Sequence, residues 1–319
     1  METFLTTFIR VAAISLMILV GVTARKRGIL TENSTKALSS LLIDYICPAA
    51  IFSSLVGSYT FREVLRGWVY PVSEILIIAI GFVVGAIAIR FFPKRSRRER
   101  CMFHYQCALL NFIFMPMPIV MSMYGERGVA ILSLGYVGGE LCVWTIGVVA
   151  VTGGISLKEL KRLFCAPMIA IMLSVVVLLI EEYVPALRPT KGGVFDAFGD
   201  GIVNVMRVLG GGTVGISMIV AGSNMANLKF RNVLQPFHLT LAACRLLLIP
   251  AICLTALHFM PIPTEGRVIC YLIAMMPCSV ASVAYSTYFG ADSETAATAI
   301  LTSHIGCLVT VPMWMSIIQ

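Results

Sequence analysis

The segment Asn-Phe-Ile-Phe-Met-Pro-Met-Pro, residues 111–118, puts two prolines in the middle of an apolar run long enough to cross a membrane. A second apolar run is interrupted in the same way by Pro277. Proline has no backbone N–H, so it removes a hydrogen bond from a helix interior. In lipid, such a break is tolerated only where protein or a water-filled cavity covers the freed backbone groups. The two runs are therefore predicted to be broken helices that cross near the middle of the bilayer.

The composition of the whole chain agrees with a membrane setting. Of the 319 residues, 58% are hydrophobic and 13% are charged, and the mean hydropathy is +0.91. A soluble domain carries about 25% charged residues, so a soluble globular fold is excluded. The net charge of +8 does not indicate nucleic-acid binding, because the basic residues cluster in the joints between apolar runs.

About 20 apolar residues are needed for one helical crossing, and the chain divides into ten such runs. Strand-like alternation is absent, so the predicted fold class is an all-α integral membrane protein. A division into residues 1–157 and 158–319 gives five spans to each half, and an odd number makes any duplication an inverted repeat. The spans are centred on Ile14, Ala49, Ile80, Phe114, Leu141, Val175, Thr213, Leu247, Pro277 and Cys307.

The basic residues of the joints predict the orientation. The joints after odd-numbered spans hold 14 lysines and arginines, and the opposite side holds 6. Basic joints stay in the cytoplasm, so both termini are expected outside it, in a multi-pass protein of the cell membrane. The first run begins with Glu2 and ends in a basic stretch at residues 25–27, which favours a retained span over a cleaved signal peptide.

The predicted crossing favours a bound anion. Each half-helix N-terminus offers free N–H groups and a partial positive charge, so a carboxylate needs no lysine or arginine there. Asn111 lies one turn before the Pro116 break, where its amide can donate to a carboxylate. Two alternatives stay open from the residues alone: a simple proline kink, and an asparagine that only bonds neighbouring helices.

Ionisable residues within spans are costly and so suggest function. Asp44 and Glu140 are expected to lie deep in their spans and are candidates for proton or ion coupling, with His304 as a further candidate relay. Glu74 is expected at a membrane boundary, and Arg207 is expected to pair with Asp200 or Asp196.

Motifs of other function classes are absent. Residues 210–215, Gly-Gly-Gly-Thr-Val-Gly, fit a nucleotide-binding pattern but lie in an apolar span with no preceding strand. Like the glycine pairs 81/85 and 135/139, they indicate close helix packing. The four histidines form no ligand cluster and the ten cysteines contain no CxxC pair. No metal, cofactor or enzymatic activity is expected.

Several segments together resemble the auxin efflux carrier family, with its plant and microbial members. Residues 111–119, followed by Tyr-Gly at 124–125, are similar to the fourth-span signature of that family. Residues 276–280, 288–292 and 310–312 are similar to its ninth and tenth spans, and residues 42–49 to its second. The resemblance covers nearly the whole chain. It departs at Met115, where the family usually has glycine, and in lacking the long central loop of plant members, which favours a compact microbial-type member.

This resemblance implies a ten-span inverted repeat of the bile-acid-symporter type, with crossing helices 4 and 9. Spans 1, 2, 6 and 7 would form a scaffold, and spans 3–5 and 8–10 a transport domain. It also implies a substrate site at the crossing, formed by Asn111, Pro116, Pro118, Pro277, Cys278 and Ser279.

Organic-anion transport is the leading functional hypothesis. Malate, malonate or an auxin-like acid would be carried by elevator-type alternating access, with a proton or sodium as coupling ion and with pairing of two copies through the scaffold. The alternative is a cation/proton antiporter of similar architecture, and a membrane enzyme or a receptor ranks lower.

Overall fold

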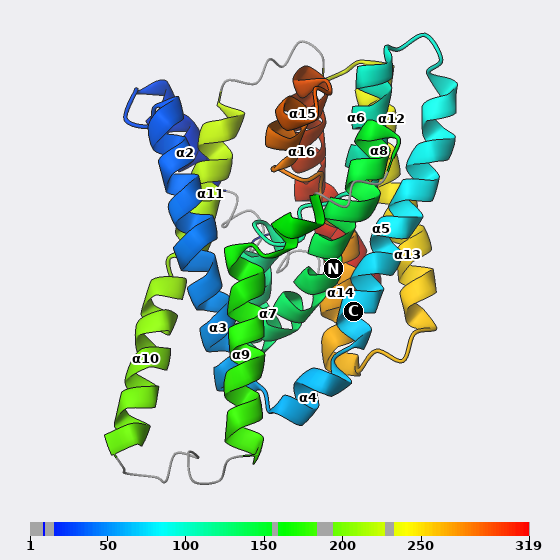
Figure 1. Ribbon diagram of the computed structural model, residues 1–319. Helices are drawn as coiled ribbons and strands as arrows, with labels where there is room; N and C mark the ends of the chain where they lie inside the picture. Colours follow the sequence, from blue (N-terminus) through cyan, green and yellow to red (C-terminus); the bar gives the residue numbers. More distant parts are fainter. Residues whose placement is uncertain (1–8, 10–15, 155–158, 184–193, 227–232, 319) are drawn as a thin grey trace.

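The computed structural model describes residues 9, 16–154, 159–183, 194–226 and 233–318, and these fold almost entirely into helices (Figure 1). The expected first span, centred on Ile14, lies in part outside the described residues. Within them, seven helical segments are long and apolar enough to cross a membrane, and they are 32–58, 61–91, 116–152, 166–183, 199–225, 236–258 and 293–318. The all-α membrane prediction is confirmed. The count of ten stays a prediction, because the fourth and ninth runs are divided into shorter helices.

The first half of the chain is built from helices α2 to α8. They are α2 (Glu32–Leu41), α3 (Cys47–Ser58), α4 (Phe61–Arg66), α5 (Val69–Ala88), α6 (Arg97–Ala108), α7 (Pro116–Cys142) and α8 (Val148–Thr152). A short 3-10 helix, η2 (Ile89–Phe91), ends α5, and another, η4 (Glu159–Leu163), lies in the joint to the second half.

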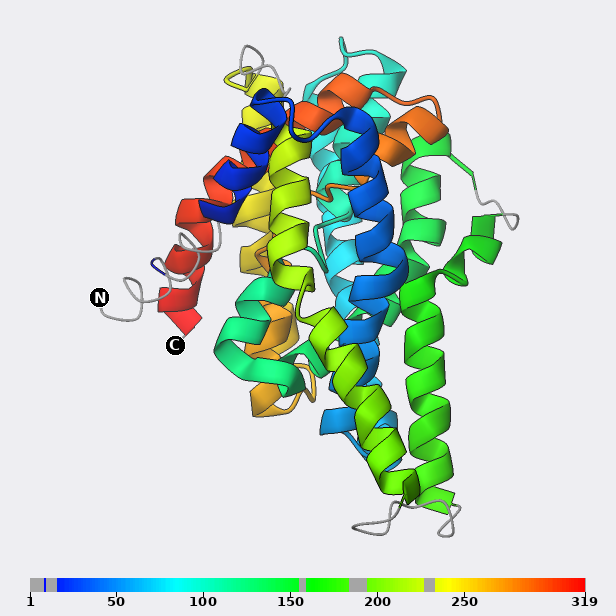
Figure 2. The same ribbon diagram turned by 90° about the vertical axis from the view of Figure 1, so that its left-hand side faces the viewer.

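The second half contains helices α9 to α16. They are α9 (Ala166–Tyr183), α10 (Val194–Gly210), α11 (Thr213–Met225), α12 (Pro236–Ala243), α13 (Ile249–His258), α14 (Thr264–Ala274), α15 (Ser282–Tyr288) and α16 (Ser293–Ile318). Helix α3 packs against α9 and α10, and α5 packs against α6 and α7. Figures 1 and 2 show α9 and α10 extending beyond the rest of the bundle at one end.

Single π-helical turns interrupt three of the long helices: η1 (Leu42–Ile46), η3 (Val143–Gly147) and η7 (Cys244–Leu248). Two of them, η1 and η7, are each followed two residues later by a proline, Pro48 and Pro250. A proline inside a helix removes one hydrogen bond and crowds the preceding turn, and a widened turn absorbs both effects. These spans therefore stay continuous across their prolines.

The fourth and ninth runs are truly broken. Helix α6 ends at Ala108, Leu109 is extended, and α7 begins at Pro116. In the second half, α14 ends at Ala274 and α15 begins at Ser282. Helix α7 itself contains a further break at Gly125, whose φ of 61° lies in the left-handed region that glycine favours. It separates the remainder of the fourth run from the fifth.

Glycines bring helices into close contact, as the sequence indicated. A Cβ at Gly81 of α5 would lie 2.4 Å from the Cys107 carbonyl oxygen of α6, and one at Gly210 of α10 would lie 2.6 Å from the Ala50 Cα of α3. Side chains at these positions would push the helices apart. Within residues 210–215, Gly210 therefore allows close helix packing, whereas Gly215 faces open space.

The structure shows the surroundings of three charged residues that the sequence singled out. Glu74 is 1% exposed, because it lies on the face of α5 that packs against α7 and α14; its position at a membrane boundary stays a prediction. Asp44 is exposed, since the π turn η1 directs it away from the core. Arg207 pairs with Glu126 of α7 at 2.5 Å and not with Asp200; the side chain of Asp196 lies outside the described part of the chain.

Candidate functional site

The two irregular segments cross and pair with each other. The backbone N–H of Asn111 donates to the Pro277 carbonyl at 2.8 Å, and the N–H of Ser279 donates to the Leu109 carbonyl at 3.4 Å. Leu110 and Cys278 thereby form an isolated antiparallel bridge. The freed backbone groups of one break are thus partly satisfied by the other, which is the condition for irregular backbone inside a membrane.

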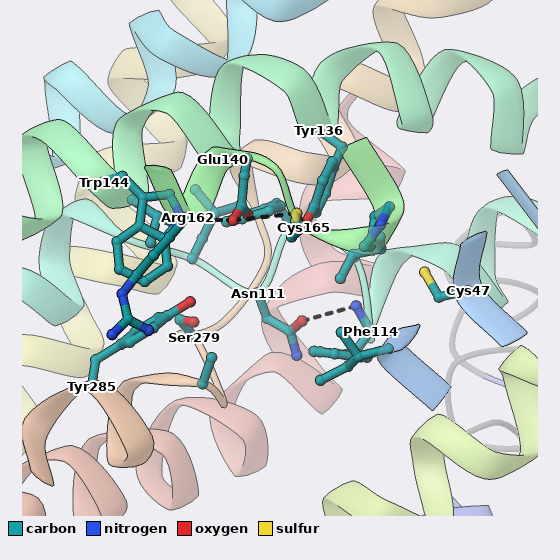
Figure 3. Close-up of a pocket in the computed structure, with 17 residues that line it drawn as sticks. Cys47, Asn111, Phe114, Tyr136, Glu140, Trp144, Arg162, Cys165, Ser279 and Tyr285 are labelled. Atoms are coloured by element: carbon teal, nitrogen blue, oxygen red, sulfur yellow. Dashed lines mark hydrogen bonds between the residues drawn. The ribbon is translucent and has the colours of Figure 1, made fainter. Parts of the chain in front are cut away.

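A cavity of about 380 Å³ opens beside this crossing (Figure 3). Its volume lies in the range of small-molecule sites, roughly 300–1,000 Å³. The walls are mainly apolar and aromatic, with few polar groups. They are formed by Ile43, Cys47, Leu110, Asn111, Phe112, Ile113, Phe114, Tyr136, Glu140, Val143, Trp144, Arg162, Cys165, Pro167, Ser279, Ala281 and Tyr285.

Asn111 has two roles at the wall of this cavity. Its side-chain oxygen accepts hydrogen bonds from the backbone N–H groups of Phe114, at 3.1 Å, and Met115, at 3.4 Å. These bonds fix the chain as it enters α7. The amide nitrogen lies 3.5 Å from Nε2 of His304. Asn111 is 4% exposed and lines the cavity.

His304 supports Asn111 from behind. Its Nδ1 lies 2.8 Å from the Ile300 carbonyl oxygen, which can only accept, so Nδ1 carries the proton. In the neutral ring, Nε2 is then the acceptor for the Asn111 amide. His304 is buried and is not among the residues that line the cavity, so it positions the asparagine.

The remaining residues expected at the crossing divide into two groups. Ser279 lines the cavity. Pro116, Pro118, Pro277 and Cys278 do not, and instead shape the backbone around it. Cys278 is fully buried, and its backbone N–H donates to Ser303 Oγ at 3.1 Å.

Among the described residues, Glu140 is the single carboxylate that lines the cavity. It is 6% exposed. Its Oε1 accepts from the Trp144 indole N–H at 2.8 Å and lies 3.8 Å from Cys165 Sγ. Helix α7 and the π turn η3 place Glu140 and Trp144 on one face. Asp44, by contrast, does not reach this cavity, although its neighbour Ile43 does.

Arg162 is the single cation that lines the cavity in the described part of the chain. It comes from η4, in the joint between the two halves, and the sequence pattern marked it only as a topology residue. Its guanidinium lies 4.3 Å from the Tyr288 ring centroid and 5.3 Å from that of Trp144. Its Nε is 2.8 Å from Glu159. Burial opposes its charge, but Tyr288 and Glu159 outweigh burial and raise the pKa of Arg162, so it stays cationic.

Arg245 binds backbone carbonyls of both broken runs next to the crossing. It is fully buried, and its guanidinium donates to three carbonyls: Ala274 at 2.7 Å, Met276 at 3.0 Å and Cys107 at 3.3 Å. These carbonyls belong to the C-terminal ends of α14 and α6, where the partial charge is negative. A charged side chain in an apolar span signals function, but nothing in the sequence shows that its partners lie 138 and about 30 residues away.

Glu74 is a second buried carboxylate near the crossing. Its Oε1 has no hydrogen-bond partner. It does not line the cavity, but it lies beside the glycines at 135 and 139 of α7. Burying an unpaired polar atom is costly, and the position of Glu74 in the sequence did not indicate this burial.

A family model described as membrane transport protein matches residues 6–154 and 151–315. An uncharacterized transporter from Methanothermobacter thermautotrophicus is 22% identical over 317 residues, which is 95% of this chain and 96% of that protein.

Two plant proteins also match part of the chain. PIN-LIKES 1 and PIN-LIKES 3 of Arabidopsis thaliana are 26% and 27% identical over 160 residues. These matches cover 46% of this chain, 34% of PIN-LIKES 1 and 41% of PIN-LIKES 3. The family model accounts for almost every residue from 6 to 315, so the chain belongs to the membrane transport protein family that contains the auxin efflux carriers.

Proposed function

We propose that this chain is a secondary transporter of small organic anions across the cell membrane, by elevator-type alternating access. The observation that carries the proposal is the meeting of two broken helices at a cavity lined by Asn111 and Ser279. Two half-helices, α7 and α15, begin beside it. Carboxylates such as malate, malonate or an auxin-like acid fit its electrostatics, because helix N-termini favour negative charge.

Charge around the crossing supports anion binding on one side only. Arg245 occupies the carbonyl ends of α6 and α14, so the negative helix ends are compensated inside the protein. The cavity side keeps the positive helix ends, the Asn111 amide and the Arg162 guanidinium. A carboxylate entering past Arg162 would move towards the Asn111 amide.

The walls of the cavity support an elevator mechanism. Ile43 and Cys47 belong to the second predicted span. Cys165 directly precedes the sixth span, and Pro167 lies in its first turn. Both spans belong to the scaffold in the proposed division. Asn111, Glu140 and Ser279 belong to the proposed transport domain. A site between a fixed unit and a moving one is what alternating access requires.

Coupling is assigned to the carboxylate beside the site. An ionised Glu140 would repel an anionic substrate, so proton uptake at Glu140 would favour loading, and His304 would adjust the Asn111 amide. Asp44 is too exposed to serve. The proposal keeps both termini on the outer side and allows pairing of two copies through the scaffold.

The alternative is a cation/proton antiporter of similar architecture. It would need carboxylates that converge on the crossing. Within the described residues, Glu140 is the single carboxylate that lines the cavity, and Glu74 is buried away from it. This arrangement favours the anion carrier.

Flux assays in liposomes that contain the purified protein distinguish the anion transporter from the antiporter. Uptake of labelled malate, malonate or indole-3-acetate above that of empty liposomes is expected. Sodium or proton flux driven by an imposed gradient without any organic anion would favour the antiporter. A thermal-shift screen of mono- and dicarboxylates at two pH values would identify the substrate class and any proton linkage.

A further inference from the structure

A second cavity, of about 290 Å³, lies at the end of the molecule where α6 begins, α8 ends and the turn between α15 and α16 passes. Figure 1 places these three segments together at the top. Arg97, Arg98, Thr152 and Gly290 are among the residues that line it. It shares no lining residue with the cavity at the crossing, so a ligand here would be separate from the transported anion.

The charge in this cavity is positive and uncompensated. Arg97 and Arg98 form the first turn of α6, where cations are disfavoured because the helix N-terminus is itself positive. Neither has an acidic partner among the described residues. Both side chains are exposed and point to a cavity that is too large for one water molecule.

The carboxylate in the same turn of α6 is already occupied. Glu99 accepts from the Ser96 backbone N–H at 2.9 Å and from Arg95 at 2.8 Å. Burial raises the pKa of Glu99, but these hydrogen bonds outweigh it and lower the pKa overall. Arg95 in turn also donates to Gln235 and lies over the Phe237 ring. Of the arginines in this turn, Arg97 and Arg98 are the pair whose charge faces the cavity.

The position along the chain matches the headgroup layer of a bilayer. Helix α5 and η2 end at Phe91, which is 77% exposed. The run at residues 94–100 follows directly and contains five basic residues among seven. Basic clusters immediately outside a membrane span attract anionic lipid headgroups, and arginine binds phosphate oxygens in a two-pronged geometry.

We propose that this cavity binds a phosphate group through Arg97 and Arg98, supplied by the headgroup of an anionic phospholipid or by free phosphate. The site joins the start of one broken helix, α6, to the segment that follows the other, after α15. A bound phosphate would therefore hold together the start of α6 and the end of α15, which are the ends of these helices that lie away from the crossing. The proposal does not depend on which solute the protein carries.

Binding to the purified full-length protein tests this site. The delipidated protein would be titrated with phosphatidylglycerol, phosphatidylcholine and inorganic phosphate, and complexes would be followed by native mass spectrometry and thermal shift. Phosphatidylglycerol should bind at least about tenfold more tightly than phosphatidylcholine. Stabilisation by inorganic phosphate at millimolar concentration would identify free phosphate as the source, and stabilisation by the lipid alone would identify the headgroup. The absence of both would overturn the proposal.

Matched variants separate the cavity from general attraction to a basic surface. Arg97→Gln/Arg98→Gln should lose about tenfold in affinity. Lys26→Gln/Arg27→Gln removes the same charge from exposed residues at the same end of the molecule and should bind as the unmodified protein does. Equal losses in both pairs would contradict a built site. Arg97→Lys/Arg98→Lys keeps the charge but not the two-pronged geometry, and its affinity should lie between those of the unmodified protein and the glutamine variant. It tests the site even if the glutamine variant fails to fold.

Discussion

Asn111 has a structural role and, in the proposed function, a binding role in the same side chain. Its oxygen accepts from the backbone at the start of α7, and its nitrogen faces His304 and the cavity. Replacement by alanine would remove both roles at once and leave the cause of any defect undecided. Replacement by aspartate separates them, because aspartate caps helices as well as asparagine does.

Asn111→Asp is therefore expected to fold normally and to lose anion binding. The carboxylate keeps the oxygen acceptor, removes the amide donor and adds a negative charge at the site. A lost hydrogen bond to a charged ligand is worth roughly 1.5–3 kcal/mol, or about 10–100-fold in affinity. Thermal shift of the unliganded protein and binding of the transported carboxylate are the two measurements. Unchanged affinity would remove Asn111 from the site.

Arg162 is expected to attract substrate without taking part in its translocation. Arg162→Gln should raise the KM for uptake about fivefold, equivalent to roughly 1 kcal/mol for a partly exposed charge, with little change in the maximal rate. Lys161→Gln is the matched control, because Lys161 is exposed and does not line the cavity. Equal effects of both substitutions would reduce Arg162 to a general surface charge.

At the scale of helices, the contact of α5 with α6 depends on one missing side chain. A Cβ at Gly81 would lie 2.4 Å from the Cys107 carbonyl, which is backbone and cannot turn away. Gly81→Ala should lower stability by about 1–3 kcal/mol, seen as a lower Tm in detergent. Gly215→Ala should leave Tm unchanged or raise it, since nothing lies within 4 Å of that Cβ and alanine favours helix. A tolerated Gly81→Ala would mean that the two helices separate freely.

The ion pair between Glu126 and Arg207 acts at the scale of the whole molecule, because it joins α7 of the proposed transport domain to α10 of the proposed scaffold. Both side chains are partly exposed, so the pair should contribute less than about 1 kcal/mol to stability. Glu126→Gln and Arg207→Gln should each increase hydrogen exchange around residues 124–128. The double variant should match either single variant. Additive effects would show that the two residues do not act together.

The sequence predicted the local features of this molecule better than its distant contacts. The spans of Pro48 and Pro250 stay continuous, but the prolines at 116, 118 and 277 do stand at helix breaks, so the crossing and Asn111 were accessible from residues 111–118 and 277. The burial of Glu74 was not predicted, because distance from a span end gives depth but not the face that a helix buries. Arg162 and Arg245 were not assigned, since their partners, Tyr288 and the Cys107 carbonyl, lie more than 100 residues away along the chain.

The Arg245 guanidinium has a consequence for the empty carrier. Its positive charge is covalently attached, so neither dialysis nor a change of ionic strength removes it from the carbonyls of Cys107, Ala274 and Met276. In the proposed transport cycle, the carbonyls at the crossing would therefore keep this positive charge throughout. Between cycles, the vacant protein should keep the same architecture and be ready for the next solute.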